Sequence, residues 1–140
     1  MTNEELILLA KRARESAIVD VSGFKVGAAL LTGGGEVILG CNIEDPSGIG
    51  ITNICAERCA IVKALSEGHR DFVKIAVVGG KVVENSSDGD ELIFCAPCGA
   101  CRQYINSWCP KIKVIMQEDN GEIKEYDMSK LLPYSFNEKF

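Results

Sequence analysis

Two short stretches, each at the expected start of a helix, carry three cysteines between them and constrain the fold more than any other feature. The first reads C-A-E-R from Cys55, and the second reads P-C-G-A-C-R-Q from Pro97. A proline suits the first turn of a helix, and Cys98 and Cys101, three residues apart, share one helical face. The unpaired N–H groups and the positive dipole end of a helix start favour the thiolate, which is the form that binds metal. The pattern therefore predicts two helix starts that meet at one metal ion.

The number of cysteines in this group indicates what the metal does. Structural zinc sites use four protein ligands, whereas catalytic sites use three and leave one position for water. Cys55, Cys98 and Cys101 supply three ligands, and an all-thiolate group favours Zn²⁺, one ion per chain. Zinc lowers the pKa of such a water from roughly 16 to about 7. Glu57 follows Cys55 by two residues, so it can lie against that water and move its proton as a general acid and base.

The two stretches together match the three-cysteine form of the zinc-deaminase signature, C-x-E followed by P-C-x-x-C. More narrowly, the chain resembles the small zinc-dependent cytidine deaminases of the cytidine and deoxycytidylate deaminase superfamily. The resemblance implies a hydrolase that acts on the C–N bond of a cyclic amidine. Its expected reaction is the hydrolytic deamination of cytidine and deoxycytidine to uridine and deoxyuridine plus ammonia, as in pyrimidine salvage. Glu57 would pass protons from the water to the ring nitrogen and to the departing ammonia.

The composition suits a single catalytic domain over residues 1–140, because this length supports one core. The net charge of −5 argues against a nucleic-acid partner and suits a small neutral nucleoside. No run of about 18 apolar residues could cross a membrane, and the N-terminus lacks the apolar region of an export signal. Seven cysteines without such a signal indicate the reducing environment of the cytoplasm.

Hydrophobic periodicity and turn signals predict an α/β chain in which helices and strands alternate. Such an order fits a three-layer α/β/α sandwich around a mixed sheet of about five strands, which is also the fold that the resemblance implies. The expected elements are a helix over residues 3–18 with a Thr2/Glu5 capping box, a hairpin of 24–31 and 36–41 with a glycine turn at 33–35, a helix over 55–67, a strand over 72–79, a polar loop over 80–91 with room for a short edge strand, a helix from 97 to 108, strands over 112–117 and 122–126, and a short helix from 127.

Three further motifs resemble the family's substrate-binding residues. F-x-V-G-A-A-L makes Phe24 a candidate pocket wall, although a core aromatic is an equally good interpretation from the residues alone. N-x-E assigns Asn42 and Glu44 to the ribose hydroxyls, whereas N-x-E on its own is more often a solvated loop. L-L-P-x-x-F assigns Phe136 to stacking on the base in a neighbouring subunit, against an alternative as an interior packing residue. Ala56, between the first ligand and the glutamate, completes the substrate-binding set.

Several single residues are given structural or supporting roles. Arg58 resembles the family's arginine that donates to the sulfurs and offsets the net negative charge of a zinc tris-thiolate; the alternative is a surface salt bridge. His69, the only histidine, is expected to be an exposed loop residue. Cys95 is expected to lie off the helical face that binds the metal. The remaining cysteines are expected to be small buried residues: Cys41, Cys59 and Cys109.

One segment departs from the family pattern and keeps other functions open. Residues 45–54 are about two residues longer than expected, and Gly48 stands where the family has a tyrosine that reaches a neighbouring subunit's sugar. A deaminase of a modified cytosine nucleoside, such as a blasticidin-like compound, is therefore the alternative. A polynucleotide deaminase fits the acidic charge less well. A non-catalytic structural zinc module would need a fourth ligand, for which His69 and Cys95 are the candidates. A homotetramer with sites at subunit interfaces is implied by the resemblance alone.

Overall fold

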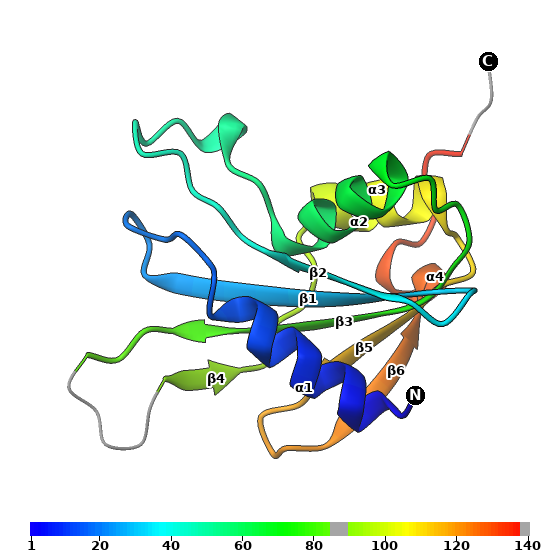
Figure 1. Cartoon of the computed structure of the whole chain (residues 1–140), viewed down its shortest axis with the longest axis horizontal. Coiled ribbons are helices and arrows are strands. Elements are labelled where there is room, and N and C mark those ends of the chain that lie inside the picture. Colours follow the sequence, from blue (N-terminus) through cyan, green and yellow to red (C-terminus); the bar gives the residue numbers. More distant parts are fainter. Residues whose placement is uncertain (85–89, 138–140) are drawn as a thin grey trace.

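The computed structural model describes residues 1–84 and 90–137, and its centre is a mixed, twisted sheet (Figure 1). The strand order is β2-β1-β3-β5-β6, with β4 paired to β3 beyond the end of β5. Among the described strands, β3 and β5 pair in parallel, and the other strand pairs are antiparallel. The strands are β1 (Phe24–Thr32), β2 (Val37–Cys41), β3 (Phe72–Lys81), β4 (Glu91–Ile93), β5 (Lys113–Gln117) and β6 (Ile123–Asp127). The five strands that were expected form the continuous path, and β4 is a sixth.

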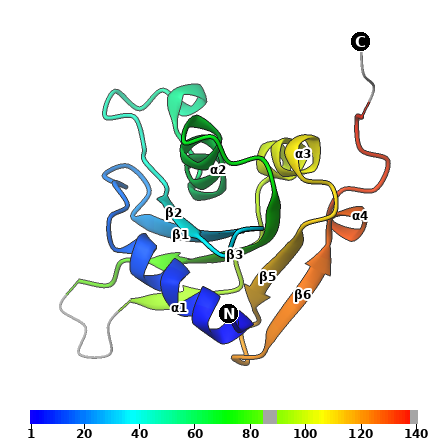
Figure 2. The same cartoon turned by 45° about the vertical axis from the view of Figure 1, so that its right-hand side comes forward.

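The helices cover both faces of the sheet, which confirms the three-layer α/β/α sandwich (Figure 2). α1 (Asn3–Arg14) packs on one face, and α2 (Ala56–Ser66) and α3 (Gly99–Trp108) lie side by side on the other. Short helical turns follow at η1 (Gly50–Thr52) and α4 (Met128–Leu131). The core under α2 and α3 includes the fully buried Leu30, Ile61, Ile75, Ile105, Ile112 and Val114. The core under α1 includes Leu6, Ile7, Ala10, Ala29, Ala76 and Ile115.

α1 begins as predicted but ends earlier. The Thr2 hydroxyl accepts a hydrogen bond from the Glu5 N–H at 3.1 Å, and the Thr2 N–H donates to the Glu5 carboxylate at 2.9 Å, which is a capping box. The helix was expected to reach residue 18, yet it ends at Arg14. Ile18 instead donates its N–H to the Asn42 carbonyl at 3.0 Å. The spacing of apolar residues over 15–18 is that of a helix. The pairing of Ile18 with the end of a distant strand determines the backbone conformation there instead.

Two glycines let the outer helices approach the sheet closely. A Cβ at Gly27 in β1 would stand 2.5 Å from the Arg14 backbone nitrogen in α1, and a Cβ at Gly40 in β2 would stand 2.6 Å from the Ala60 nitrogen in α2. Both obstructing atoms are backbone atoms, which cannot move aside as a flexible side chain can. The position of α2, and of the residues at its start, thus depends on the missing side chain at residue 40.

Arg14 is a buried charged side chain that ties α1 to the ends of two strands. Its guanidinium donates to the Lys25 carbonyl at 3.0 Å, the Gly80 carbonyl at 2.7 Å and the Asp90 carboxylate at 2.8 Å. Asp90 also accepts the Val83 N–H at 3.1 Å. These bonds organise the described parts of the segment between β3 and β4, which was expected to be a polar loop; its residues 85–89 lie outside the described part of the chain.

The remaining expected elements agree with the structure to within two residues. The glycine turn at 33–35 joins β1 and β2, with Gly35 at a φ of 89°, a conformation that favours glycine. Within residues 1–84 and 90–137, none of the helices combines the length and the apolar character needed to cross a membrane.

Candidate metal centre and active site

The three cysteines of the sequence pattern meet at the starts of α2 and α3. Cys55 is the residue that caps α2, Cys98 caps α3, and Cys101 lies in the first turn of α3. Their three Sγ atoms lie within 4.8 Å of one another, and those of Cys55 and Cys98 are 3.8 Å apart. Three sulfurs bound tetrahedrally to one zinc at about 2.3 Å would be separated by about 3.8 Å. The donor set and its spacing therefore fit Zn²⁺.

The electrostatics of the thiols also suit a cation. A hydrogen bond from the Cys101 thiol, together with smaller contributions from Arg58 and Cys98, lowers the pKa of Cys55 to about 5. The same hydrogen bond and burial raise the pKa of Cys101 far above its usual range. Without a cation only part of the cluster ionises, since adjacent negative charges repel. A metal ion supplies the positive charge that allows all three thiols to lose their protons.

Glu57 is a buried carboxyl group in the first turn of α2, with only 3% of its surface exposed. Burial, with a smaller contribution from the negative charge of Cys55, raises the pKa of Glu57 to about 7. A carboxyl group with such a pKa can both accept and release a proton near neutral pH. The charge of Cys55 acts on this carboxyl group, so Glu57 lies beside the cysteine cluster.

Arg58 directs its positive charge at the sulfurs. Its Nη2 lies 3.4 Å from the Cys55 Sγ, and this hydrogen bond raises the pKa of the guanidinium above its usual value. Within the described part of the chain, its buried Nε has no hydrogen-bond acceptor. The side chain is thus paired with a metal-binding thiol, and the alternative of a surface salt bridge does not describe its contacts.

Phe24 and Cys95 form a wall over Gly79, and the charge of Glu57 acts on Cys95. A Cβ at Gly79 in β3 would stand 2.7 Å from the Cys95 Sγ and 2.9 Å from a ring carbon of Phe24, so both side chains lie over Gly79. Burial and the nearby charge of Glu57 raise the pKa of Cys95 to about 12, which places this thiol close to the carboxyl group. Sequence reasoning excluded Cys95 as a ligand but missed it and Gly79 as part of the site. The glycine pair at the end of β3 was the only local signal.

Asn42 lies next to this wall, at the end of β2. Its side-chain amide donates to the Phe24 carbonyl at 2.9 Å and accepts from the Val26 N–H at 2.8 Å. These bonds hold the start of β1 against the end of β2, so Asn42 is not a residue of a solvated loop. Glu44 is half-buried, and its carboxylate accepts the Ser22 N–H at 3.1 Å. Each of these polar groups keeps further hydrogen-bonding capacity for a ligand.

Ala56 and Phe136 differ in how closely they approach the cluster. Ala56 is fully buried between Cys55 and Glu57. Phe136 is 60% exposed on the C-terminal segment, so the alternative of an interior packing residue is wrong. The structure thus gathers the three cysteines with Glu57 and Arg58, and it sets Phe24 and Asn42 next to one another.

Two expectations about the remaining residues need correction. His69 was expected to be exposed, but only 22% of its side chain is, and its Nε2 lies 3.3 Å from the Glu36 carboxylate at the start of the return strand. Cys41 and Cys59 are half-buried at the β2 edge of the sheet, where a small apolar residue was expected to be covered; Cys109 is buried as predicted. Among the described residues the cluster holds three ligands, and neither His69 nor Cys95 joins it as a fourth.

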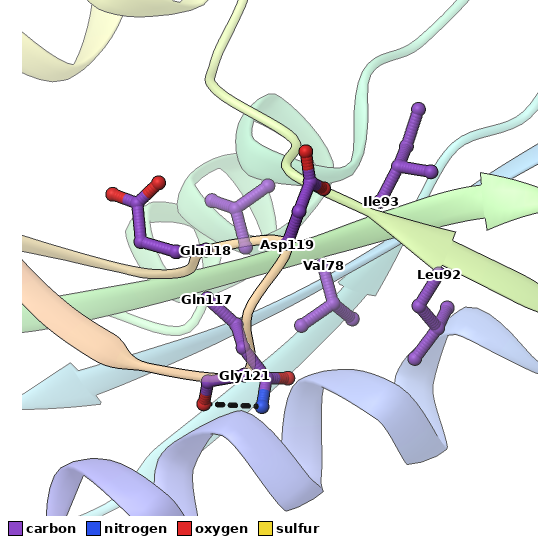
Figure 3. A pocket seen from close by; sticks show the side chains of 8 residues that line it. Val78, Leu92, Ile93, Gln117, Glu118, Asp119 and Gly121 are labelled. Carbon is purple, nitrogen blue, oxygen red and sulfur yellow. Dashed lines mark hydrogen bonds between the residues drawn. The ribbon is translucent and has the colours of Figure 1, made fainter.

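A cavity of about 200 Å³ lies apart from this site (Figure 3). It opens opposite Val78, between β4 and the turn that joins β5 to β6. Figure 3 shows Leu92 and Ile93 on one side and the Gln117 side chain, bonded to the Gly121 carbonyl at 3.0 Å, on the other. The cavity contains none of the cysteines and not Glu57. The metal-binding cluster instead stands where two helix starts meet the surface.

A three-layer sandwich in which two helix starts share three thiols beside a buried carboxyl group defines a zinc-dependent deaminase. Comparison with known proteins identifies the family. Residues 1–118 match the model of the cytidine and deoxycytidylate deaminase zinc-binding region. The chain therefore belongs to the cytidine and deoxycytidylate deaminase family, and its size and fold are those of the small cytidine deaminases.

Individual relatives agree over nearly the whole chain. A cytidine deaminase of Halalkalibacterium halodurans is 47% identical over 137 residues, covering 97% of this chain and 95% of the relative. The crystal structure of a cytidine deaminase from Burkholderia pseudomallei superposes with a TM-score of 0.82 at 40% identity, covering 97% of this chain and all of that one. A blasticidin-S deaminase of Bacillus cereus is 33% identical over 111 residues, covering 79% of this chain and 76% of the relative.

Proposed function

We propose that this chain catalyses the hydrolytic deamination of cytidine and deoxycytidine to uridine and deoxyuridine, with release of ammonia. The observation that carries the proposal is the buried Glu57 carboxyl group, with a pKa of about 7, beside three convergent thiols. The two relatives described above at 40% identity or more are both named cytidine deaminase. We assign the whole span of residues 1–140 to one catalytic domain.

The chemistry divides between the metal and the protein. Zinc held by Cys55, Cys98 and Cys101 would supply a nucleophilic hydroxide at neutral pH. Glu57 takes up the proton of the attacking water at its carboxylate, holds it in a buried site, and delivers it to the ring nitrogen. It then takes up the proton of the hydroxyl group added to the ring carbon and delivers that second proton to the leaving ammonia. Because the group is shielded from bulk water, its proton stays with the reacting atoms. Arg58 keeps the charge on Cys55 partly neutralised.

The remaining candidate residues bind and orient the nucleoside. Phe24 lies beside Cys95, and burial and the charge of Glu57 raise the pKa of the Cys95 thiol. The Phe24 ring is therefore suited to packing against the base. Asn42 and Glu44 follow β2, and their side-chain amide and carboxylate are suited to the ribose hydroxyls. Ala56 offers a backbone group between the first ligand and the proton carrier. We assign Phe136 to stacking on the base in a neighbouring subunit.

A direct assay tests the reaction. The purified protein is incubated with cytidine and with deoxycytidine, and the loss of cytosine absorbance is followed before and after a chelator strips the metal. We expect rapid turnover of both nucleosides, loss of turnover with the chelator, and recovery when zinc is added back. Protein that carries one zinc per chain and converts neither nucleoside would exclude this function.

We further propose a cytoplasmic homotetramer that serves pyrimidine salvage. Support comes from an exposed aliphatic surface on the loops beside the site: Ile18, Ile43 and Ile54 are linked by isolated backbone bridges, and Ile51 is 92% exposed. Exposed apolar surface of this kind marks interaction sites. Light scattering coupled to size exclusion should give four times the chain mass, and a monomer that retains full activity would rule out the shared sites.

The second candidate is a deaminase of a modified cytosine nucleoside, and the segment 45–54 favours it. The Asp45 carboxylate accepts hydrogen bonds from Ser47 and Thr52, and the Asp45 N–H donates to the Asn53 side chain at 2.6 Å. The segment therefore closes on itself, with the exposed Gly48 at a φ of 82°. A panel that compares cytidine, deoxycytidine and blasticidin S separates the two, since a preference of more than about tenfold for the last would select this candidate.

A further inference from the structure

The last two residues of the P-C-G-A-C-R-Q stretch, Arg102 and Gln103, do not belong to the cysteine cluster that the described residues form. Gln103 instead holds the backbone of Phe136 at two points. Its Nε2 donates to the Phe136 carbonyl at 2.9 Å, and its Oε1 accepts the Phe136 N–H at 3.3 Å. The second N–H of the amide goes to the Ser107 hydroxyl, one turn along α3, at 3.1 Å. Two of these three hydrogen bonds hold Phe136, and the third fixes the amide against its own helix.

Arg102 makes a second link between the same two segments. Its Nε donates to the carbonyl of Pro97 at 2.8 Å, directly before the ligand Cys98, and its Nη1 donates to the carbonyl of Leu131 at 2.9 Å. One guanidinium thus joins the metal-binding loop to the last residue of α4. In both views the C-terminal segment, coloured orange to red, lies on the same side of the sheet as α3 (Figures 1 and 2).

We propose that Arg102 and Gln103 are positioning residues: they fasten residues 131–136 to the metal-binding helix and so set where the Phe136 ring stands. Gln103 holds the backbone of Phe136, while 60% of that residue stays exposed. α3, which contains Cys101, therefore also holds Phe136 in place through Gln103. The ring of Phe136 is the aromatic group proposed to stack on the nucleoside base. The consequence for the nucleoside rests on the proposed function; the fastening of the segment does not.

The fastening is tested by amide hydrogen exchange on the zinc-loaded full chain. In Gln103→Ala the Phe136 amide loses its acceptor, and we expect it and its neighbours in 131–137 to exchange about tenfold faster, with Cys101 unchanged. Gln117→Ala is the matched control, because it removes a glutamine-to-carbonyl hydrogen bond of 3.0 Å in the β5–β6 turn. Equal exchange of 131–137 in Gln103→Ala and wild type would overturn the proposal, whether or not the protein deaminates cytidine.

The effect on the substrate is tested by kinetics with a double variant. In Gln103→Ala the Phe136 ring is no longer held in its place, and the binding that is lost is equal in the ground and transition states. The KM of Gln103→Ala for cytidine should therefore rise about 5- to 20-fold, while kcat stays within about twofold of wild type. Phe136→Ala should do the same, and the double variant should be no worse than Phe136→Ala alone. If the two increases multiply, or if Phe136→Ala leaves KM unchanged, Gln103 does not act through Phe136. Wild-type protein that fails to convert cytidine would instead count against the proposed function.

Discussion

At residue 57 a carboxyl group is 3% exposed beside three thiols, a position that is costly for a permanently charged group. Burial offsets this cost by raising the pKa of the Glu57 carboxyl group to about 7, which favours its neutral form. Arg58 acts in the opposite sense on Cys55, by lowering the pKa of the thiol that it contacts. At the start of α2, the surroundings therefore favour the neutral form of Glu57 and the ionised form of the nearby Cys55.

Replacing Glu57 with glutamine tests the proton carrier. The amide keeps the shape of the side chain but cannot exchange the proton, so turnover of cytidine should fall by about 10²- to 10⁴-fold or more. Zinc content should stay at one ion per chain, because the three thiols are untouched. Glu67→Gln is the control at the exposed end of the same helix, and it should leave turnover within about twofold. A Glu57→Gln enzyme with most of its activity would refute the assigned mechanism.

A second residue-scale prediction concerns Asp90 and acid. Hydrogen bonds from Arg14 and from the Val83 N–H lower the pKa of Asp90 below its usual value of 3.8. A depressed folded-state pKa adds stability that is present above pH 4 and disappears as the pH falls through the folded-state pKa. Wild type should therefore have a higher Tm than Asp90→Asn at pH 6, and the difference should shrink between pH 4 and pH 2. A difference that stays constant down to pH 2 would show that Asp90 contributes no charge-dependent stability.

At the scale of elements, residue 40 decides where α2 stands. Gly40 lies under α2, where a Cβ would stand 2.6 Å from the Ala60 nitrogen and would also meet the Ala56 carbonyl. Ala56 adjoins the ligand Cys55, so a shift of this helix moves the metal-binding turn. Glu57 also lies in the first turn of α2. The positions of Cys55 and of the Glu57 carboxyl group therefore both depend on one close contact between helix and strand.

Gly40→Ala should accordingly weaken both the fold and the site. Crowding against backbone atoms typically costs about 1–3 kcal/mol in the free energy of unfolding, since the helix must move away. We also expect faster loss of zinc to a chelator. Gly50→Ala is the matched control, because a Cβ there meets nothing within 4 Å. Denaturant titrations of the two variants, with zinc release followed by a colorimetric chelator, check both effects; a Gly40→Ala protein as stable as Gly50→Ala would contradict them.

The elements that could be predicted from the sequence are those whose signals are local. The capping box at Thr2, the glycine turn and the helix starts at the metal-binding cysteines depend on neighbours a few residues away, and the structure has them all. The predicted end of α1 was wrong because Ile18 pairs with Asn42, a residue more than twenty positions further on. Cys95 in the wall of the site was missed for the same reason, since its contact with Gly79 comes from pairing of β3 with β4.

Across the whole molecule, each of the two helices on the metal-binding side is tied to another element by a contact near its start. α2 packs closely against the sheet at Gly40, and α3 is joined to the C-terminal segment by the hydrogen bond from Arg102 to the Leu131 carbonyl. Zinc would connect the two helices directly, because Cys55 comes before one and Cys98 before the other. The family resemblance gave the ligands and the fold from sequence alone. It could not give these connections, which exist only between residues far apart in the chain.

Zinc should therefore stabilise the entire fold as well as serve the reaction. A ligand that binds only the folded state adds about 2.7 kcal/mol at a free concentration one hundred times its Kd. We expect the Tm to rise when zinc is added to chelator-treated protein and to fall again with excess chelator. Cys98→Ser should lose most of this shift, because two thiols remain. Cys41→Ser should keep it, since Cys41 lies at the β2 edge outside the cluster. Differential scanning calorimetry on the three proteins measures the shifts, and an equal zinc response in Cys98→Ser and wild type would separate zinc binding from this cluster.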